Sequence, residues 1–152
     1  MTWSDRLREL DVELPSAPAP LAAYVPAAQS GSLVFTAGQL PFVSGALPAT
    51  GKVGADVSPE EAKGYARTSA INALAAIHEL VGIDRVVRVV KVVGYVAVAE
   101  GFTAVPAVLN GASEFLGEVF GDAGRHARSA VGVSELPLGS PVEVELVVEI
   151  GE

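Results

Sequence analysis

The run RVVRVVKVVGYVAVAE, residues 85–100, constrains the fold more than any other part of the chain. Valine dominates this run, and β-branched residues favour strands. Apolar residues occupy both alternating sets of positions, whereas a strand with one solvated face carries polar residues at every second position. Both faces of the strand should therefore be covered. Helices cover one face of a sheet, so we expect other subunits to bury the second face in an oligomer.

Two helices are predicted to supply the first cover. In SPEEAKG, Ser58 is an N-cap, Pro59 fits the first helical position and Glu61 completes a capping box. This helix is expected to end at Gly82. Its apolar stripe at helical spacing comprises Ala66, Ala70, Ala73, Leu74, Ile77 and Leu80. A second helix is predicted over Thr103–Phe120.

The other strands are predicted from alternation and turn residues. AAYVPAA, a turn at QSGS and SLVFTAGQL form a hairpin candidate, while ARSAVGV and PVEVELVVEI follow the second helix. One face of the last strand carries three glutamates with Val147, and the other carries Val142, Val144, Leu146, Val148 and Ile150. The order β-β-α-β-α-β-β predicts an α+β sandwich with two helices on one face of a sheet.

The chain is predicted to form a single domain over residues 1–152, with an N-terminal arm over residues 1–21. A short amphipathic helix is predicted over Ser4–Leu10, with Ser4 as its N-cap. The proline-rich stretch LPSAPAPLAAYVPA is expected to lie extended on the body. Pro41–Val57 lacks a period and is predicted to be a loop.

Composition excludes several classes of protein. The formal net charge is −8 and the basic residues are scattered, so nucleic acid is not an expected partner. The chain has no cysteine, and its two histidines lack carboxylates at ligand spacing, so no thiolate or other metal site is predicted. The charged start MTWSDRLREL and the lack of a long apolar run predict a cytoplasmic protein without a membrane span.

Arg128 is an unexpected residue in the apolar strand ARSAVGV. Alternation points its side chain to the face opposite Ser129, and desolvating a guanidinium without an anionic partner is costly. One interpretation is an internal salt bridge with Glu143 or Glu145 on a neighbouring strand. The other is a planar two-pronged clamp for a ligand carboxylate. Both interpretations remain open at this point.

Of three further residues, two have a structural and a functional interpretation, and the third has only a structural one. Glu143 is either a solvated carboxylate or part of a site, and His126 is either a surface-loop residue or a polar wall of a pocket. His78, within the first long helix, is interpreted as structural. No serine or threonine has a nearby histidine base, so a hydrolase triad is not predicted.

The segments FTAGQ, ARS and LP followed by VEVE resemble, in order and spacing, the RidA/YjgF family of small trimeric imine deaminases. The resemblance runs from Ala22 to Ile150 and suggests a longer, divergent subgroup. It implies a chorismate-mutase-like fold in which three subunits pack their sheets into a central barrel, with pockets in the clefts between subunits. It also implies hydrolysis of 2-imino acids, such as 2-iminobutanoate, to 2-oxo acids and ammonia without a cofactor.

The resemblance assigns roles to individual residues. Arg128 would hold the carboxylate of a small metabolite, and Glu143 would position water or relay a proton. The pocket would also be lined by Tyr24, Gly38, Asn110, His126 and Ala130.

The chain departs from the family pattern at the floor of this pocket. Active deaminases commonly carry a serine where this chain has Ala37 and a cysteine where it has Ala130, and His126 replaces a usual proline. A second function therefore stays open, a non-catalytic trimer that binds or senses a small carboxylate metabolite. Ribonuclease activity has been attached to parts of the family, but the negative charge argues against it here.

Overall fold

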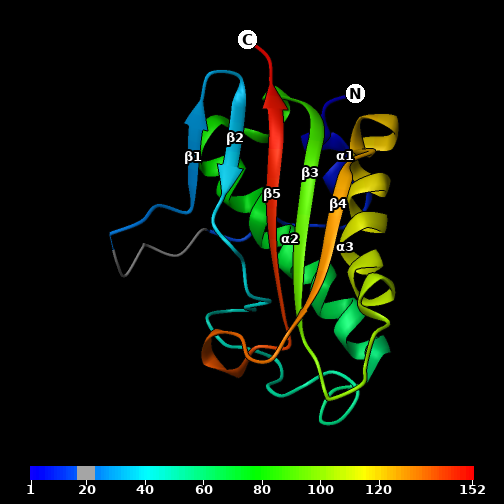
Figure 1. Ribbon diagram of the computed structural model, residues 1–152. Coiled ribbons are helices and arrows are strands. Elements are labelled where there is room, and N and C mark those ends of the chain that lie inside the picture. The colour runs from blue at the N-terminus through cyan, green and yellow to red at the C-terminus, as the bar shows by residue number, and fades with distance from the viewer. Residues whose placement is uncertain (17–22) are drawn as a thin grey trace.

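The computed structural model describes residues 1–16 and 23–152, in which helices cover one face of a five-stranded sheet (Figure 1). The strand order is β1-β2-β5-β3-β4; β3 and β4 are parallel, and the other neighbouring strands are antiparallel. The predicted α+β architecture is confirmed. The elements are α1 (Trp3–Glu9), β1 (Ala27–Ser30), β2 (Leu33–Thr36), α2 (Pro59–Val81), β3 (Val86–Ala97), α3 (Val105–Phe120), β4 (Ala127–Val133) and β5 (Val142–Ile150), with 3-10 turns at Ile83–Arg85, Gly121–Gly124 and Pro137–Gly139.

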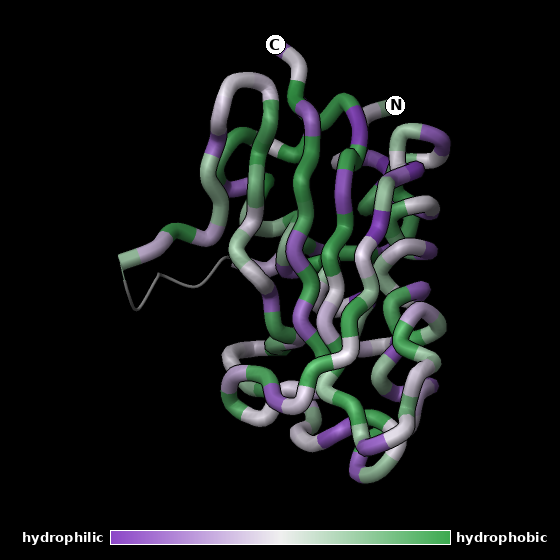
Figure 2. The backbone as a smooth tube through the Cα atoms, in the orientation of Figure 1, coloured by the Kyte–Doolittle hydropathy of each residue, from purple (hydrophilic) through white to green (hydrophobic). Residues whose placement is uncertain are grey.

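The core lies between the sheet and the helices α2 and α3. β5 alternates as predicted, and its apolar set is buried while its glutamates are half-buried on the other face. The alternation is visible along β5 in Figure 2. The predicted stripe of α2 is buried from Ala66 to Ile77, but Leu80 is 46% exposed. The prediction that Leu80 belongs to the buried stripe was wrong, because the buried part of α2 ends at Ile77, about one turn earlier.

The ends of α2 are largely those predicted. The Ser58 hydroxyl accepts a hydrogen bond from the backbone N–H of Glu61 at 3.1 Å, and Gly82 ends the helix with a φ of 86°. The Glu61 carboxylate accepts from the Ser58 hydroxyl at 3.0 Å instead of completing the expected capping box. His78 is structural, as predicted, because its Nδ1 accepts from the backbone N–H of Ile83 at 3.1 Å.

Helices α2 and α3 are packed backbone to backbone at Gly111. A Cβ atom added there would lie 1.9 Å from the carbonyl oxygen of Lys63, so only glycine fits. Beside this contact, the Lys63 ammonium pairs with the Glu114 carboxylate at 3.0 Å. The Arg67 guanidinium lies 4.9 Å from the centre of the Phe115 ring. The two helices therefore form a single unit with a short interaxial spacing.

Helix α1 begins earlier than predicted, at Trp3, with Thr2 as its N-cap. Thr2 and Asp5 form a reciprocal capping box, which lowers the pKa of the Asp5 carboxyl. Ser4 was predicted to be the N-cap. It is instead used in a tertiary contact, because its backbone N–H and hydroxyl both donate to the Asp84 carboxylate, at 2.8 and 2.7 Å.

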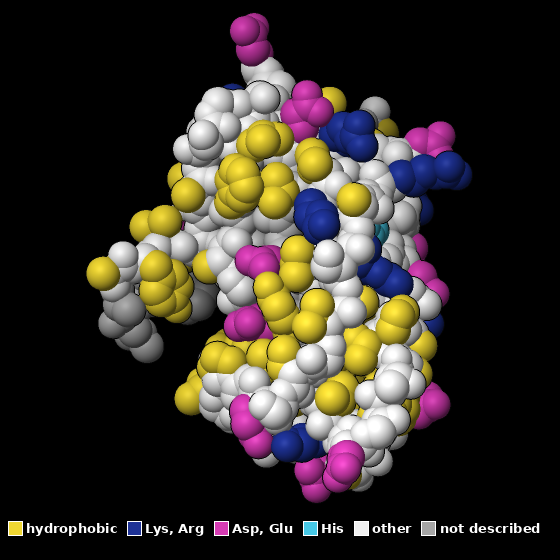
Figure 3. All heavy atoms as spheres, viewed as in Figure 1, with side chains coloured by type: hydrophobic (Ala, Val, Ile, Leu, Met, Phe, Trp, Pro, Cys, Tyr) yellow, Lys and Arg dark blue, Asp and Glu magenta, His cyan; other side chains and the backbone are white. Residues whose placement is uncertain are grey.

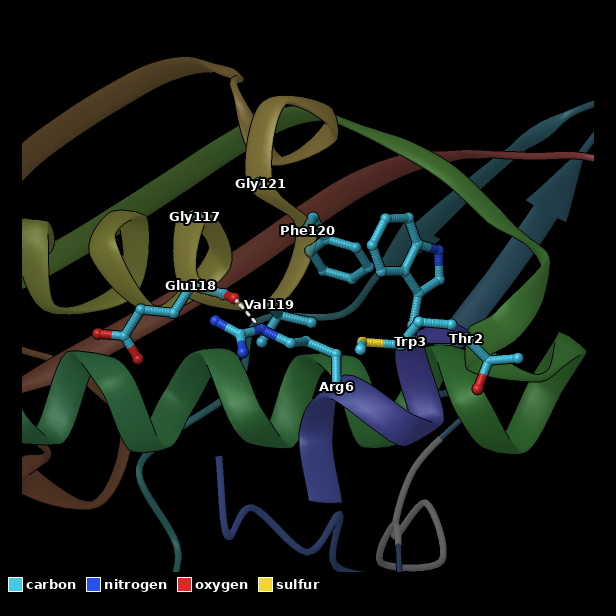
Figure 4. A pocket seen from close by; sticks show the side chains of 9 residues that line it. Thr2, Trp3, Arg6, Gly117, Glu118, Val119, Phe120 and Gly121 are labelled. Atoms are coloured by element: carbon cyan, nitrogen blue, oxygen red, sulfur yellow. Dashed lines mark hydrogen bonds between the residues drawn. The ribbon is translucent and has the colours of Figure 1, made fainter. Parts of the chain in front are cut away.

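Helix α1 packs on the C-terminal end of α3 (Figure 4). The Trp3 indole N–H donates to the carbonyl of Val86 at 2.8 Å, and its ring meets the Phe120 ring edge-on at 5.0 Å. Arg6 donates from Nε to the carbonyl of Glu118 at 2.9 Å. These two hydrogen bonds and the ring contact attach α1 to the rest of the domain. Of the proline-rich arm that follows it, residues 17–22 lie outside the described residues.

The hairpin is confirmed but begins later than predicted. β1 starts at Ala27, and the turn is made by Gly31, with a φ of 60°, and Ser32. Ala22 of the segment AAYVPAA lies outside the described residues, and Ala27 and Ala28 belong to β1 as predicted. Residues 23–26 precede the strand, because Pro26 has no N–H to donate to a ladder. The carbonyl of Pro26 nevertheless accepts a hydrogen bond from the N–H of Ala37 at 2.8 Å. Tyr24 therefore lies outside the sheet and is 60% exposed.

No helix or strand among the described residues covers the second face of the sheet. β3 shifts register against β5 between Val86 and Arg88 and again between Val89 and Lys91, and such bulges increase strand twist. Large apolar side chains remain accessible on this open face, with Phe35 at 44% and Val131 at 41%. Hydrophobic side chains gather over it in Figure 3.

Candidate functional site

Arg128 lies on the edge strand β4, on the face that the helices cover. It pairs laterally with Val92 of β3, which pairs with Leu146 of β5, and both of these are buried in the core. At the edge, the side chain reaches α3. Its Nη1 donates to Asn110 Oδ1 at 2.8 Å and to Ser113 Oγ at 3.2 Å.

The guanidinium of Arg128 is held by neutral acceptors. Among the ion pairs of residues 1–16 and 23–152, none includes Arg128. The internal salt bridge with Glu143 or Glu145 is therefore not formed. The reason is topological, since β3 separates β4 from β5 and the two glutamates point to the open face.

The two Nη1 protons of Arg128 match the two acceptors on α3. Within the described part of the chain, Nε and Nη2 donate no hydrogen bond. These two groups form the side of a guanidinium that presents parallel N–H donors. That side matches the two oxygens of a carboxylate.

His126 is also part of this arrangement. Its Nε2 lies 2.9 Å from Ser113 Oγ, and its Nδ1 lies 2.6 Å from the carbonyl oxygen of Gly124. Both ring nitrogens are therefore engaged within the chain. The expectation that no serine has a nearby histidine was wrong, because α3 brings Ser113 to the ring of His126. The pair is not a hydrolase triad, because Nδ1 faces a backbone carbonyl and not a carboxylate. Ala130 shares the face of Arg128 and packs against the core. We call Asn110, Ser113, His126 and Arg128 the arginine cluster.

Glu143 belongs to a different group of side chains, on the open face. It pairs laterally with Tyr95, whose hydroxyl donates to the Glu145 carboxylate at 2.8 Å. Burial, and then the negative charge of Glu145, raise the pKa of Glu143. The hydrogen bond to Glu145, followed by burial and the two glutamate charges, raises the pKa of Tyr95.

Gly38 lies against Glu143 because the ladder between β2 and β5 is interrupted. Thr36 Oγ1 accepts from the N–H of Leu146 at 2.9 Å, and the ladder resumes one residue out of register at Gln39 and Val144. A Cβ atom at Gly38 would lie 2.8 Å from Glu143 Cδ. A side chain at Gly38 would therefore displace the carboxylate. We call Gly38, Tyr95, Glu143 and Glu145 the carboxylate cluster.

The two clusters cannot meet one small ligand within a single chain. They lie on opposite faces of the sheet, and Arg128 is in the lateral row of Val92 while Glu143 is in that of Tyr95. Three residues along a strand correspond to about 10 Å. Tyr24, the other predicted pocket residue, is in neither cluster.

Sequence reasoning missed Ser113 and Tyr95. Ser113 follows Asn110 by three residues on a predicted helix, so the two share a face, and this spacing was an available signal. Tyr95 lies in a predicted strand, but only the lateral register places it beside Glu143.

A surface depression of about 330 Å³ lies elsewhere, between α1 and the end of α3 (Figure 4). It is lined by Met1, Thr2, Trp3, Arg6 and residues 117–121, and it includes no member of either cluster. Arg6, the basic side chain that lines it, is already bonded to the Glu118 carbonyl and to Glu9. In residues 1–16 and 23–152, no helix is long and apolar enough to cross a membrane.

Comparison with known proteins places the chain in a family. The family model described as "YjgF/chorismate mutase-like, putative endoribonuclease" matches residues 4–150. Protein TCP17 of Trypanosoma cruzi is 41% identical over 148 residues, which are 95% of this chain and 91% of that protein.

Two crystal structures are similar over nearly their whole length. The Agrobacterium tumefaciens protein Atu1372, of unknown function, is 41% identical with a TM-score of 0.90 and covers 98% of this chain and 92% of its own. A Shewanella oneidensis protein described as a putative endoribonuclease is 34% identical with a TM-score of 0.94. The match covers 99% of this chain and 100% of that protein. The chain therefore belongs to the YjgF/RidA family, with its chorismate-mutase-like fold.

Proposed function

We propose that the chain forms a cytoplasmic homotrimer that binds a small 2-oxo or 2-imino carboxylate between subunits and hydrolyses 2-imino acids. The observation that carries this proposal is the unpaired side of the Arg128 guanidinium. Its Nη1 is fixed by Asn110 and Ser113, while Nε and Nη2 have no acceptor among the described residues. A half-buried cation in this state favours an anionic ligand over solvent.

The separation of the two clusters supports a site shared between subunits. A carboxylate bound at Arg128 needs a reacting group nearby, and Glu143 of the same chain faces the other way. A second copy, packed by its open face, supplies the missing carboxylate cluster. The exposed Phe35 and Val131 on that face are apolar surface that such a contact would bury.

The reaction requires few groups. Water adds to the C=N carbon of the bound 2-imino acid, and Glu143 accepts one water proton and passes it to nitrogen, which gives a carbinolamine. Glu143 then transfers the hydroxyl proton of the carbinolamine to nitrogen as the C=O bond forms, the C–N bond breaks and ammonia leaves. A raised pKa makes the Glu143 carboxylate a stronger base for this step. Binding of the substrate carboxylate by Arg128 holds the reacting carbon in place.

The positions Ala37 and Ala130 lack the hydroxyl and thiol of active deaminases. The backbone N–H of Ala130 remains a donor for a ligand carboxylate. The same loss favours a second candidate function, which is binding or sensing of the carboxylate metabolite without turnover. In either case Arg128 holds the ligand.

One experiment separates these functions. 2-Iminopropanoate is generated in situ, its rate of loss is measured with and without the protein, and binding of 2-oxobutanoate is measured by calorimetry. Accelerated loss supports the deaminase, and binding without acceleration supports the sensor. If the protein neither binds 2-oxobutanoate nor accelerates the loss of 2-iminopropanoate, both functions are refuted. An RNA oligonucleotide incubated in parallel tests the activity named for the family, which the net charge of −8 disfavours.

A further inference from the structure

A continuous chain of hydrogen bonds runs from the 3-10 turn Gly121–Gly124, which follows α3, to the guanidinium of Arg128. It passes from the Gly124 carbonyl to the ring of His126 at 2.6 Å, from that ring to Ser113 Oγ at 2.9 Å, and from Ser113 to Arg128 Nη1 at 3.2 Å. All three side chains are half-buried. The chain is thus sheltered from water that would otherwise compete for its hydrogen bonds.

The chemistry of the partners gives this chain a direction. A carbonyl oxygen can only accept, so His126 Nδ1 carries a proton and donates to Gly124. In the neutral ring Nε2 then has a lone pair, and it accepts the hydroxyl proton of Ser113. Ser113 Oγ therefore turns a lone pair towards Arg128, whose guanidinium can only donate.

Ser113 makes this bond instead of a common alternative. A serine within a helix often donates to the carbonyl four residues earlier, as the hydroxyl of Thr68 does to Gly64 at 3.3 Å in α2. The His126 ring draws the Ser113 hydroxyl away from its own helix. Together with Asn110, this fixes both protons of Nη1 and leaves the Nε–Nη2 side in one orientation.

We propose that His126 and Ser113 are positioning residues that hold the Arg128 guanidinium ready for a ligand carboxylate. This inference rests on the proposed function for the identity of the ligand. It gives His126 a role through Ser113, since neither ring nitrogen is left for the ligand. A fixed guanidinium loses less conformational freedom on binding, so the affinity gain comes from pre-organisation.

The first test needs no ligand. In the free protein, NMR of the Arg128 guanidinium should show separate, slowly exchanging Nη signals because rotation about its bonds is restricted. Ser113→Ala and His126→Phe should average these signals. In His126→Gln, whose amide oxygen can accept in place of Nε2, and in Ser113→Thr, the Nη signals should remain separate. Thr68→Ala, which removes a hydroxyl from α2, is the matched control and should change nothing.

The second test measures 2-oxobutanoate affinity and imine turnover for the same variants. Ser113→Ala and His126→Phe should weaken binding roughly three- to tenfold, the effect of one lost hydrogen bond, and His126→Gln and Ser113→Thr should retain it. Guanidinium signals that stay separate in Ser113→Ala and His126→Phe would overturn the positioning role, whatever the wild type binds. If the signals average while the wild type binds no oxo acid, positioning stands and the proposed function fails.

Discussion

The arginine cluster and the carboxylate cluster differ in how their charges are balanced. Arg128 is held by neutral oxygens on α3 and has no carboxylate partner among the described residues. Glu143 lies beside Glu145, and burial together with that second negative charge raises its pKa. The arginine cluster has a cation without an anionic partner among the described residues. The carboxylate cluster has two carboxylates side by side, and their repulsion contributes to the raised pKa of Glu143. In the proposed site between subunits, each cluster would provide what the other lacks.

The largest expected effect is on turnover in Glu143→Gln. Removing a general base costs about 100-fold or more in rate, while the affinity for 2-oxobutanoate should be unchanged or tighter because one negative charge is gone. Imine loss and calorimetry measure the two quantities. Glu149→Gln, on the same face of β5, is the control. Equal turnover in the two variants would remove Glu143 from the mechanism.

Arg128→Ala should lower affinity about 30-fold, since it removes charged hydrogen bonds made in both the ground state and the transition state. Turnover should fall with it. Arg125→Ala is the matched control, because Arg125 is an exposed cation three residues away that lies 3.6 Å from the Asp122 carboxylate. Calorimetry with 2-oxobutanoate measures the difference. Unchanged affinity in Arg128→Ala would contradict both the deaminase and the sensor.

Mixing the two inactive variants tests whether the clusters act across subunits. In trimers reassembled from equal amounts of Arg128→Ala and Glu143→Gln chains, about one quarter of the sites would contain both native groups. Imine turnover should rise to that fraction of the wild-type rate, and light scattering should give the mass of a trimer. Mixed trimers with no gain in turnover, or a monomer at micromolar concentration, would break the proposed pairing of the clusters.

The smallest effect is on thermal stability. The pKa of Glu143 in the folded chain is raised above its ordinary value of 4.5, so between 4.5 and the raised pKa the folded state retains a proton that the unfolded state has lost. Stability therefore falls as pH rises from that value through the raised pKa. Glu143→Gln should melt about 1–2 °C higher than wild type at pH 7 and at the same temperature at pH 4. Thermal denaturation at fixed protein concentration, with Glu149→Gln alongside, measures this. An equal gain at both pH values would mean that ionisation of Glu143 is not the cause.

Most of the fold could be predicted because its signals are local. The alternation of β5, the N-cap Ser58 and the terminating Gly82 each act within a few residues, and all three are confirmed. The N-cap of α1 could not be chosen in this way. Thr2 and Ser4 are both suitable N-caps, and the choice depends on the contact of Ser4 with Asp84, eighty residues away in sequence.

The site could be predicted only in part, for a related reason. Alternation within one strand correctly placed Arg128 on the face opposite Ser129. It could not relate that face to the face of Glu143 on another strand, because this relation depends on the register through β3. The sequence therefore suggested candidate residues, but not their separation into two clusters.

The close contact at Gly111 links the stability of the core to the geometry of the site. Gly111 follows Asn110 directly and lies two residues before Ser113, so the same turn of α3 that touches the Lys63 carbonyl also carries both acceptors of Arg128. Any side chain at position 111 would push this turn away from α2. The guanidinium would then lose its supports although no residue that touches it had changed. The proposed ligand site thus depends on a residue that has no side chain and faces the opposite helix.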